Sequence, residues 1–418
     1  MQVDQFTTRD LQSLPQSWPL PRKQHAIDII AAGGIVRDAH LPAYRKAGFP
    51  VAGIYDPDPE QAHARAREFG IPRVYESLEE AVSQKNVIDL ATPPEAHLEV
   101  LQKIPRGSTV LIQKPMGRDL EEARKIWELC REKQLKAAVN FQLRFSPMML
   151  PIREALARGV FGELNEVEIR LACQTPWELW PFLEKLEDVE VLVHSIHYLD
   201  WIRSLLGEPS GAYCHAVPHP RFPNLKDARN SIILACDRPV RCCLSLNHTY
   251  SHGPRHQQAT IRIEGDRGAA QVSLGLLLNY PEGEPETLEI VSEGLEWIPI
   301  PLNGRWFPDA FIGVMSNLQR YADGDDETLI TSVELSVPWP WSMPASARTV
   351  PEPHPSSRMP ELPPTPVKND HPEGETENHS RVHLQPTPTM NFEHPEVQVF
   401  LKNVNIGADS RENVVRLY

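Results

Sequence analysis

The stretch Ala26-Ile27-Asp28-Ile29-Ile30-Ala31-Ala32-Gly33-Gly34-Ile35-Val36 decides the fold, because a short apolar strand runs straight into a glycine-containing turn. In dinucleotide-binding units, glycines at this place let the backbone approach a pyrophosphate at the N-terminus of a helix. Gly33 is the central glycine of the G-x-G-x-x-G pattern, whereas Ala31 and Val36 occupy its outer positions. A plain strand-to-helix turn fits these residues equally well. The residues predicted to form a cofactor-binding turn are Gly33, Gly34 and Ile35.

A carboxylate at the end of the next apolar run strengthens the prediction of a dinucleotide site. Asp56 directly follows Val51-Ala52-Gly53-Ile54-Tyr55. An acid at this place accepts hydrogen bonds from the adenosine ribose and disfavours a ribose 2′-phosphate, so NAD is favoured and NADP is the alternative cofactor. The other interpretation of Asp56 is an ordinary turn aspartate before Pro57.

Two patterns of apolar runs divide the chain. Up to about residue 145, strands alternate with helix-like segments, which predicts βαβ units and a parallel sheet. From about 150 to 330 strand-like runs follow one another with few crossover helices, which predicts a largely antiparallel sheet. The first set of strands is expected at 26–30, 51–55, 87–91, 110–112 and 137–139, with helices at 59–69 and 120–133. The second set is expected at 164–171, 231–235, 240–246, 258–263, 269–274 and 287–291.

Size, charge and cysteine usage limit the class of protein. A chain of 418 residues exceeds one typical core, so two domains are expected. The net charge of −14 and the lack of a Lys/Arg cluster argue against nucleic acid and an anionic membrane as partners. No apolar run reaches the roughly 18 residues of a spanning helix, and the N-terminus lacks a signal-peptide pattern. Six scattered cysteines favour free thiols in the cytoplasm.

A lysine and two histidines point to a reaction. Lys114, in Gln113-Lys114-Pro115, follows the apolar run at 109–112 and is therefore expected at the carboxyl end of a strand, where ligands bind in open α/β sheets. His197 from a later segment could meet it there and share a proton transfer. His194 lies on the same face as His197 if this segment is helical. Two histidines without a nearby third ligand make a poor metal site, so no metal is predicted.

An ordered set of motifs resembles the Gfo/Idh/MocA oxidoreductases over residues 26–334. The resemblance implies an α/β fold with an N-terminal Rossmann domain and a second α/β domain built on a large, mostly antiparallel open sheet. It also implies a homodimer or homotetramer, and hydride transfer between a nicotinamide cofactor and a hydroxyl or carbonyl carbon of a sugar, cyclitol or related polyol. The motifs are Gly33-Gly34, Asp56, Ala91-Thr92-Pro93-Pro94-Glu95-Ala96-His97, Lys114-Pro115, Phe141-Gln142-Leu143-Arg144-Phe145, Gly162-Glu163-Leu164, His197-Tyr198-Leu199-Asp200 and Trp306-Phe307-Pro308-Asp309-Ala310-Phe311.

The resemblance assigns the reaction to Lys114 and His197 and also exposes two departures. Lys114 matches the family lysine that contacts both cofactor and substrate hydroxyl, and His197 matches the family histidine. Gln113 stands where the family usually has glutamate, and Val193 stands where many members carry an aspartate that completes the triad. His194 either substitutes for that missing acid or packs at a domain seam.

Other positions follow from the same resemblance. Thr92 and Pro93 are expected to line the nicotinamide side of the cofactor cleft. His97 resembles a family position and could equally be a residue at a helix N-terminus. The further residues predicted to reach the substrate are Asn140, Gln142, Arg144, Trp177 and Trp180. For Arg144 an interdomain salt bridge is the main alternative, and for the tryptophans a place in a core or interface.

The expected organisation is an N-terminal extension (1–25), an NAD(P)-binding Rossmann domain (26–148), a substrate and oligomerisation domain (149–334) and a proline-rich, largely disordered tail (335–418). The tail holds 14 of the 41 prolines. Where the family continues into a helix, this chain has Pro338, Pro340 and Pro344, which cannot sustain one. One hypothesis is that a frameshift has replaced the terminal helix; the other is an authentic disordered extension.

Three functions fit these residues. An NAD(P)-dependent dehydrogenase or reductase is favoured by Lys114, Asp56 and His197. A catalytically silent nucleotide-binding sensor is favoured by the departures at Ala31, Val36, Gln113 and Val193. Redox-neutral NAD chemistry, such as glycosidic cleavage through a transient keto sugar, uses the same lysine and cofactor. The prediction is an enzyme acting on a small sugar-like substrate.

Overall fold

The structure, a computed structural model, describes residues 6–179, 183, 189–225, 227–280 and 282–333. All of them fall within the first compact unit of the chain, residues 1–349. The predictions for Trp180 and for the tail at 335–418 lie outside the described residues.

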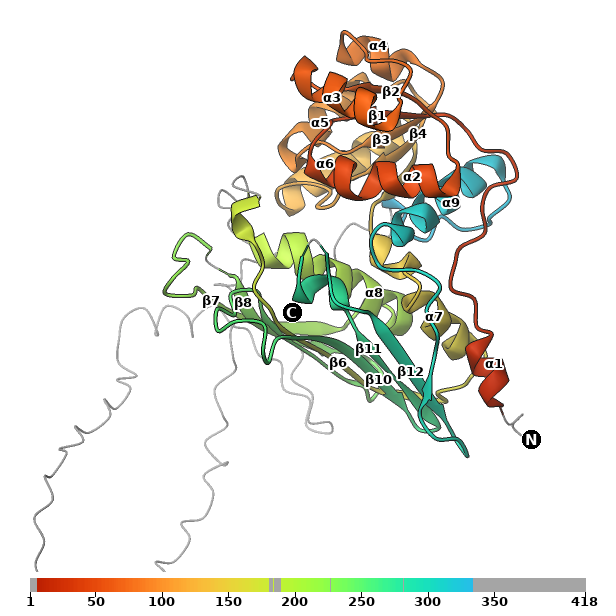
Figure 1. Cartoon of the computed structure of the whole chain (residues 1–418), viewed down its shortest axis with the longest axis vertical. Coiled ribbons are helices and arrows are strands. Elements are labelled where there is room, and N and C mark those ends of the chain that lie inside the picture. The colour runs from red at the N-terminus through yellow and green to blue at the C-terminus, as the bar shows by residue number, and fades with distance from the viewer. Residues whose placement is uncertain (1–5, 180–182, 184–188, 226, 281, 334–418) are drawn as a thin grey trace, which may run out of the picture. The chain divides into compact units, whose positions relative to one another are not determined.

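The first sheet is a parallel five-stranded sheet with the strand order β2-β1-β3-β4-β5 (Figure 1). Each predicted strand is confirmed to within one residue at either end. Short connections into helices leave parallel pairing as the favoured arrangement of these buried runs. The strands are β1 (Ile27–Ile30), β2 (Val51–Tyr55), β3 (Val87–Leu90), β4 (Thr109–Ile112) and β5 (Lys136–Val139).

Helices cover both faces of this sheet. Successive residues of a strand point to opposite faces, so they pack into two different cores. Ile27 and Ile29 pack with residues of α2 and α3, whereas Ile30 packs with residues of α4, α5 and α6. Side chains of Asp58, Ser77 and Asp119 cap three of the helix N-termini. The elements are π-helix η1 (Val36–His40), α2 (Leu41–Ala47), α3 (Pro59–Phe69), α4 (Leu78–Ser83), α5 (Pro94–Lys103) and α6 (Leu120–Glu132).

The second sheet has eight strands in the order β13-β12-β11-β10-β6-β9-β8-β7. Every adjacent pair is antiparallel except β6 and β9, which confirms the predicted mostly antiparallel sheet. The strands β7 and β13 were not predicted, because the first is a half-buried edge strand and the second has only two residues. The bounds are β6 (Leu164–Ala172), β7 (Gly211–Val217), β8 (Arg229–Ala235), β9 (Arg241–Asn247), β10 (Gln258–Gly265), β11 (Gly268–Ser273), β12 (Thr287–Ser292) and β13 (Ile298–Pro299).

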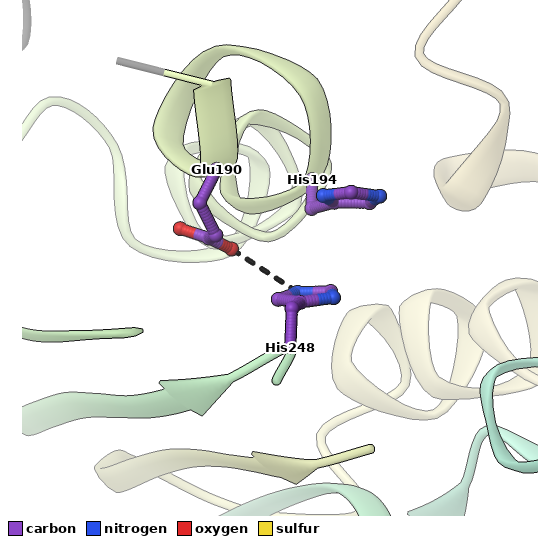
Figure 2. Close-up of side chains that lie close together, drawn as sticks. All are labelled: Glu190, His194 and His248. Carbon is purple, nitrogen blue, oxygen red and sulfur yellow. Dashed lines mark ion pairs between the residues drawn. The ribbon is translucent and has the colours of Figure 1, made fainter. Parts of the chain in front are cut away.

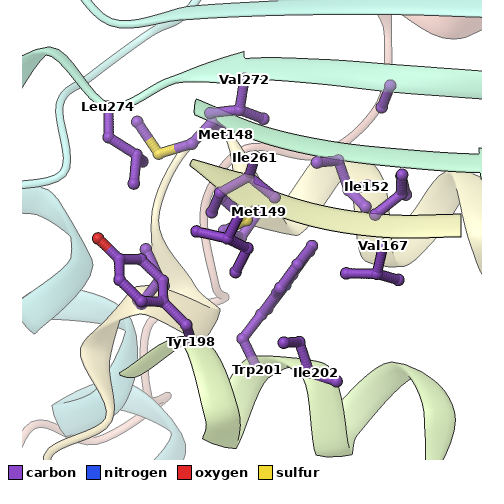
Figure 3. Close-up of a cluster of buried hydrophobic side chains, with 14 of the residues drawn as sticks. Met148, Met149, Ile152, Val167, Tyr198, Trp201, Ile202, Ile261, Val272 and Leu274 are labelled. Atoms are coloured by element: carbon purple, nitrogen blue, oxygen red, sulfur yellow. The ribbon is translucent and has the colours of Figure 1, made fainter. Parts of the chain in front are cut away.

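Helices α7 (Met149–Ala157) and α8 (Ile196–Leu206) lie along one face of the large sheet (Figure 1). Their apolar side chains meet those of the sheet in one core (Figure 3). Trp201 of α8 is only 2% exposed within that core. Burying an aromatic side chain of this size against the sheet fixes α8, and with it the histidine segment at its start.

Two segments connect the regions around the two sheets. Helix α1 (Thr8–Gln12) places Leu11 in the core of the large sheet. Helix α9 (Asp309–Asp323) returns to the parallel sheet, where Phe311, Val314, Met315 and Leu318 join the core of α2 and α3. Gly313 lies so close to Phe145 that a Cβ atom at this position would lie 2.5 Å from the Phe145 Cβ. The short elements are η2 (Gln142–Phe145), η3 (Trp177–Leu179), π-helix η5 (Val191–Ser195) and η6 (Gly275–Leu278).

Candidate active site

The turn after β1 has the backbone of a dinucleotide-binding turn despite its missing glycines. Ala31 adopts a φ of +105°, a left-handed conformation that glycine adopts without strain and alanine does not. A Cβ atom built on Gly33 meets nothing within 4 Å, and one on Gly34 meets only the Asp38 carboxylate at 4.0 Å. Val36, at the third glycine position, is fully buried, and a π-helix begins there. The turn therefore leaves open space for a phosphate group before the helix.

Asp56 holds this turn and retains the capacity to bind a ribose. Its Oδ2 accepts a hydrogen bond from the Ala32 N–H at 2.7 Å, and its Oδ1 accepts one from the Asp58 N–H at 2.8 Å. Each carboxylate oxygen has a second lone pair, so the half-buried side chain can still accept bonds from ribose hydroxyls. The structure therefore shows the turn-aspartate contacts of Asp56 and leaves its carboxylate oxygens able to accept further bonds.

The loops after β3 and β4 are tied together by His97. This fully buried side chain lies in α5, with Nε2 2.9 Å from the Thr92 carbonyl and Nδ1 3.0 Å from the Met116 carbonyl. Burial lowers the pKa of His97, and the two carbonyls oppose this effect, because only the protonated ring can donate to both of them. Its nitrogens therefore position the two loops instead of reaching into the cleft.

Close to His97, the Thr92 hydroxyl is buried and has no hydrogen-bond partner among the described residues. Pro93 is exposed at the start of α5. A buried hydroxyl at the carboxyl end of a parallel strand can be satisfied by a polar atom of a bound group. The open turn at Gly33, the Asp56 carboxylate and this hydroxyl lie at the ends of neighbouring strands. Together they fit a nicotinamide dinucleotide.

Lys114 lies at the end of β4 and reaches toward the histidine segment. Its Nζ donates to the Val193 carbonyl of η5 at 3.0 Å. Burial lowers the pKa of Lys114 to about 8, because a low-dielectric environment disfavours the ammonium. The neighbouring Gln113 is buried and accepts a hydrogen bond from the Asn140 amide at 2.8 Å. The glutamine thus links the ends of β4 and β5 with neutral groups.

His194 and His197 both lie close to Lys114. The pKa of each ring is lowered well below its ordinary value, first by burial and then by neighbouring charges that include the Lys114 ammonium. His197 is the second residue of α8 and contacts the rings of Phe141 and Trp306 edge-on. The Nδ1 atoms of both histidines lack hydrogen-bond partners in the described part of the chain. Two neutral imidazoles therefore stand near the ammonium.

Two residues that the sequence did not identify lie behind His194 (Figure 2). The His194 ring stacks on His248 with centroids 4.2 Å apart and planes inclined by 22°. His248 Nε2 lies 3.2 Å from Glu190 Oε1, and both residues are fully buried. Burial opposes protonation of His248, but Cys173 and Glu190 outweigh it and raise its pKa. Glu190 precedes His194 by one helical turn, a spacing that the sequence could have revealed, whereas the approach of His248 depends on β9.

The other predicted substrate residues are buried, and some of them have structural partners. Asn140 and Gln142 are each about 1% exposed; Asn140 donates to Gln113, but Asn140 Oδ1 and Gln142 Oε1 have no hydrogen-bond partner among the described residues. Arg144 forms an ion pair with Asp200 of α8 and donates to the carbonyls of Asp200 and Ile330, which confirms its predicted salt bridge. Trp177 is buried, donates from Nε1 to the His248 carbonyl at 3.2 Å and packs edge-on against His194. Trp177 therefore packs against the rings of both His194 and His248.

Comparisons with known proteins agree with this architecture. Residues 26–141 match the family model described as an oxidoreductase family with an NAD-binding Rossmann fold. The chain is 27% identical over 308 residues to an uncharacterized oxidoreductase of Synechocystis sp., a match that covers 66% of this chain and 81% of that protein. It is 29% identical over 188 residues to 1,5-anhydro-D-fructose reductase of Ensifer adhaerens, which covers 43% of this chain and 56% of the reductase.

A solved structure shows the same fold. The UDP-N-acetylglucosamine 3-dehydrogenase of Acidithiobacillus ferrooxidans superposes with a TM-score of 0.60 at 21% identity. The superposition covers 75% of this chain and 94% of that protein. The fold predicted from the sequence, a Rossmann sheet followed by a large, mostly antiparallel sheet, is confirmed.

Proposed function

Because the chain belongs to the Gfo/Idh/MocA family of oxidoreductases, we propose that it transfers hydride between NAD and a hydroxyl or carbonyl carbon of a sugar, cyclitol or related polyol. The observation that carries this proposal is the position of Lys114. Its ammonium lies at the carboxyl end of a parallel strand, near two neutral imidazoles. The relatives that act on anhydrofructose and on a nucleotide-linked amino sugar support a substrate rich in hydroxyl groups.

The residues of the chain supply positioning and proton transfer. Bound NAD supplies the hydride acceptor in oxidation, and its reduced form supplies the donor in reduction. Lys114 is mostly charged at neutral pH, so its ammonium can stabilise an alkoxide or polarise a carbonyl oxygen. His197 is neutral, so its Nδ1 or Nε2 can accept the proton of a substrate hydroxyl. Asp56 fits the ribose and favours NAD over NADP, which remains the alternative cofactor.

A catalytically silent nucleotide-binding sensor is the second candidate. It is favoured by one contact, since the Lys114 ammonium donates to the backbone carbonyl of Val193, where many family members have an acid. A neutral carbonyl can orient the lysine but cannot accept its proton. Redox-neutral glycosidic cleavage remains the third candidate, because it needs the same lysine and cofactor.

The test is a fluorescence titration with NADH, followed by an absorbance screen of sugars and inositols with NAD and NADH. We expect saturable cofactor binding and turnover with at least one polyol. Lys114→Met should lower turnover by roughly 10²–10³ while saturable cofactor binding remains measurable. Saturable binding without turnover on any polyol would instead support the sensor, and cleavage of a glycoside without net change in NADH would support the redox-neutral reaction.

We also propose that the protein is a cytoplasmic homodimer or homotetramer that associates through the large sheet. Alternate residues of β8 and β9 remain exposed on the face away from α8, among them Ile233 at 52% exposure. None of the six cysteine thiols forms a disulfide, which suits a reducing compartment. No helix in the described ranges has the length and apolarity needed to cross a membrane. Sedimentation velocity of the wild type and of Ile233→Lys tests the association; a monomeric wild type would contradict it.

A further inference from the structure

Glu190, His194 and His248 bring one carboxylate and two imidazoles together (Figure 2). Glu190 precedes π-helix η5, which carries His194, and His248 directly follows β9. One ligand atom from each side chain lies within 4.8 Å of the other two. Two histidines and one glutamate are a ligand set of three-coordinate protein zinc sites that keep a fourth position open.

Outer contacts orient two of these ligands. The Nδ1 of His248 lies 2.8 Å from the Thr175 hydroxyl, which leaves Nε2 facing Glu190. The Ser195 hydroxyl donates to both Glu190 oxygens, at 2.9 and 2.7 Å, and the Asn230 amide donates to Oε2. Such partners on the far side of a ligand fix its orientation and are typical of metal sites.

One buried ring nitrogen of each histidine lacks a hydrogen bond. His248 Nε2 is fully buried, and although it lies 3.2 Å from Glu190 Oε1 the pair does not have the angles of a hydrogen bond. His194 Nδ1 is also buried and has no partner among the residues with described positions. His248 Nε2 is held by its ion pair with Glu190, whereas the His194 nitrogen has no partner to offset its desolvation, and a coordinated ion would supply one.

We propose that Glu190, His194 and His248 bind one divalent transition-metal ion, with zinc as the ion of matching ligand preference. The His194 and His248 rings are nearly parallel in the structure, so the half-buried His194 ring must turn about its Cβ–Cγ bond to direct a nitrogen at the ion, at ~2.1 Å. The nearby Lys114 ammonium weakens the site, and the Glu190 carboxylate offsets this repulsion. The inference concerns binding of the ion and does not depend on the hydride transfer proposed above.

The experiment uses the full-length protein, freed of metal with a chelator and titrated with Co²⁺ as a spectroscopic probe. We expect one equivalent of Co²⁺ to give the visible absorption of a four-coordinate nitrogen and oxygen site, and one equivalent of Zn²⁺ to abolish it. Mass spectrometry of the dialysed protein gives the metal content independently.

The His194→Ala variant should lose this absorption, because it removes one ligand and leaves the contact between Glu190 and His248 in place. His63→Ala is the matched control, since His63 is exposed on α3, outside the cluster. Circular dichroism and NADH binding report whether each variant is folded. X-ray absorption of the zinc-loaded wild type, which does not depend on any variant, should show two imidazole ligands and no sulfur.

Several results would overturn the proposal. One is a wild type that binds no cobalt above the level of His194→Ala. Another is a folded His194→Ala variant that retains the full cobalt spectrum. A thiolate-to-cobalt charge-transfer band, or sulfur in the zinc spectrum, would place the ion at cysteines. Each of these results leaves the proposed hydride transfer untouched, because that is measured by turnover.

Discussion

The two regions that meet at Lys114 depart from the family pattern in different ways. On the side of the parallel sheet, the departures at Ala31 and Gln113 keep the local geometry, since Ala31 adopts the φ of a glycine and Gln113 still bridges two strand ends. On the side of α8, Val193 removes an acid, and the structure places His194, His248 and Glu190 around the gap. The first region keeps the backbone geometry with different residues, whereas the second has a buried cluster of titratable side chains near the position of the missing acid.

This difference shows where new chemistry can enter the fold. Backbone turns and strand ends tolerate substitutions that preserve geometry, because many side chains can adopt the same φ or donate the same bond. A missing proton acceptor can only be replaced by other titratable groups. Two histidines from separate elements lie near the position of the missing acid, and they are held by packing against Trp177 and by hydrogen bonds around Glu190.

The largest expected effect comes from breaking the buried cluster at Glu190. Glu190→Ala leaves the His248 side chain buried without its carboxylate partner, so we expect a loss of about 3–5 kcal/mol in the free energy of unfolding. Urea denaturation followed by circular dichroism measures the loss. A matched double variant, Glu190→Leu with His248→Phe, removes both charges and should lose much less. If both variants lose the same free energy, the pair is not the source of the effect.

The next effect concerns turnover on the side of the parallel sheet. Lys114→Met removes the ammonium that polarises the substrate oxygen, and we expect a fall in kcat of roughly 10²–10³. The measurement is steady-state turnover with the best polyol found in the screen. Lys103→Met is the control, because Lys103 is partly exposed on α5 and pairs only with surface glutamates. A similar fall in both variants would argue against a direct role for Lys114.

The charge of Lys114 also predicts a pH dependence. Its pKa of about 8 means that the ammonium is present below pH 8 and is lost as the pH rises through that value. The rate of carbonyl reduction, which uses the ammonium as a donor, should therefore fall above about pH 8. Lys114→Arg keeps a positive charge at all these pH values, and any activity it retains should lack this fall. A wild-type profile that rises across the same range would contradict the assignment.

A smaller effect is expected for the choice of cofactor. Asp56→Asn removes the negative charge next to the ribose, so we expect NAD to bind roughly tenfold more weakly, about 1.4 kcal/mol, while NADP binding changes little. Fluorescence titrations with NADH and NADPH give the ratio. Asp58→Asn is the matched control, because Asp58 caps α3 and does not hold the turn. An unchanged NADH to NADPH ratio in Asp56→Asn would reject the ribose role.

The sequence predicted the parallel sheet closely for a physical reason. Its strands are short, continuous apolar runs separated by helices with clear N-terminal caps, so each element is encoded locally. The same holds for the position of Lys114 at a strand end. The sequence did not predict the edge strand β7, because most of its side chains are half-buried and buried and exposed positions do not alternate clearly along it.

The histidine cluster could not be predicted in full, because it depends on contacts distant in sequence. His194 and His197 were identified from their spacing, yet His248 reaches His194 only through the register of β9 beside β6. The expectation of no metal rested on the lack of a third ligand near two histidines. The structure places Glu190 and His248 beside His194, two residues that this reasoning did not consider.

The smallest effect tests whether the dinucleotide turn carries strain. Ala31→Gly relieves a φ of +105°, which costs alanine roughly 1–3 kcal/mol, but it also loses a buried methyl group and adds chain entropy to the unfolded state. We therefore expect a net gain of up to about 1 kcal/mol in the free energy of unfolding, measured by urea denaturation. Ala32→Gly is the control: Ala32 is fully buried and is not among the residues with positive φ, so it should lose about 1 kcal/mol. Equal losses in both variants would mean that Ala31 is not strained, and that the turn has adapted to alanine instead of keeping the conformation of the glycine it lacks.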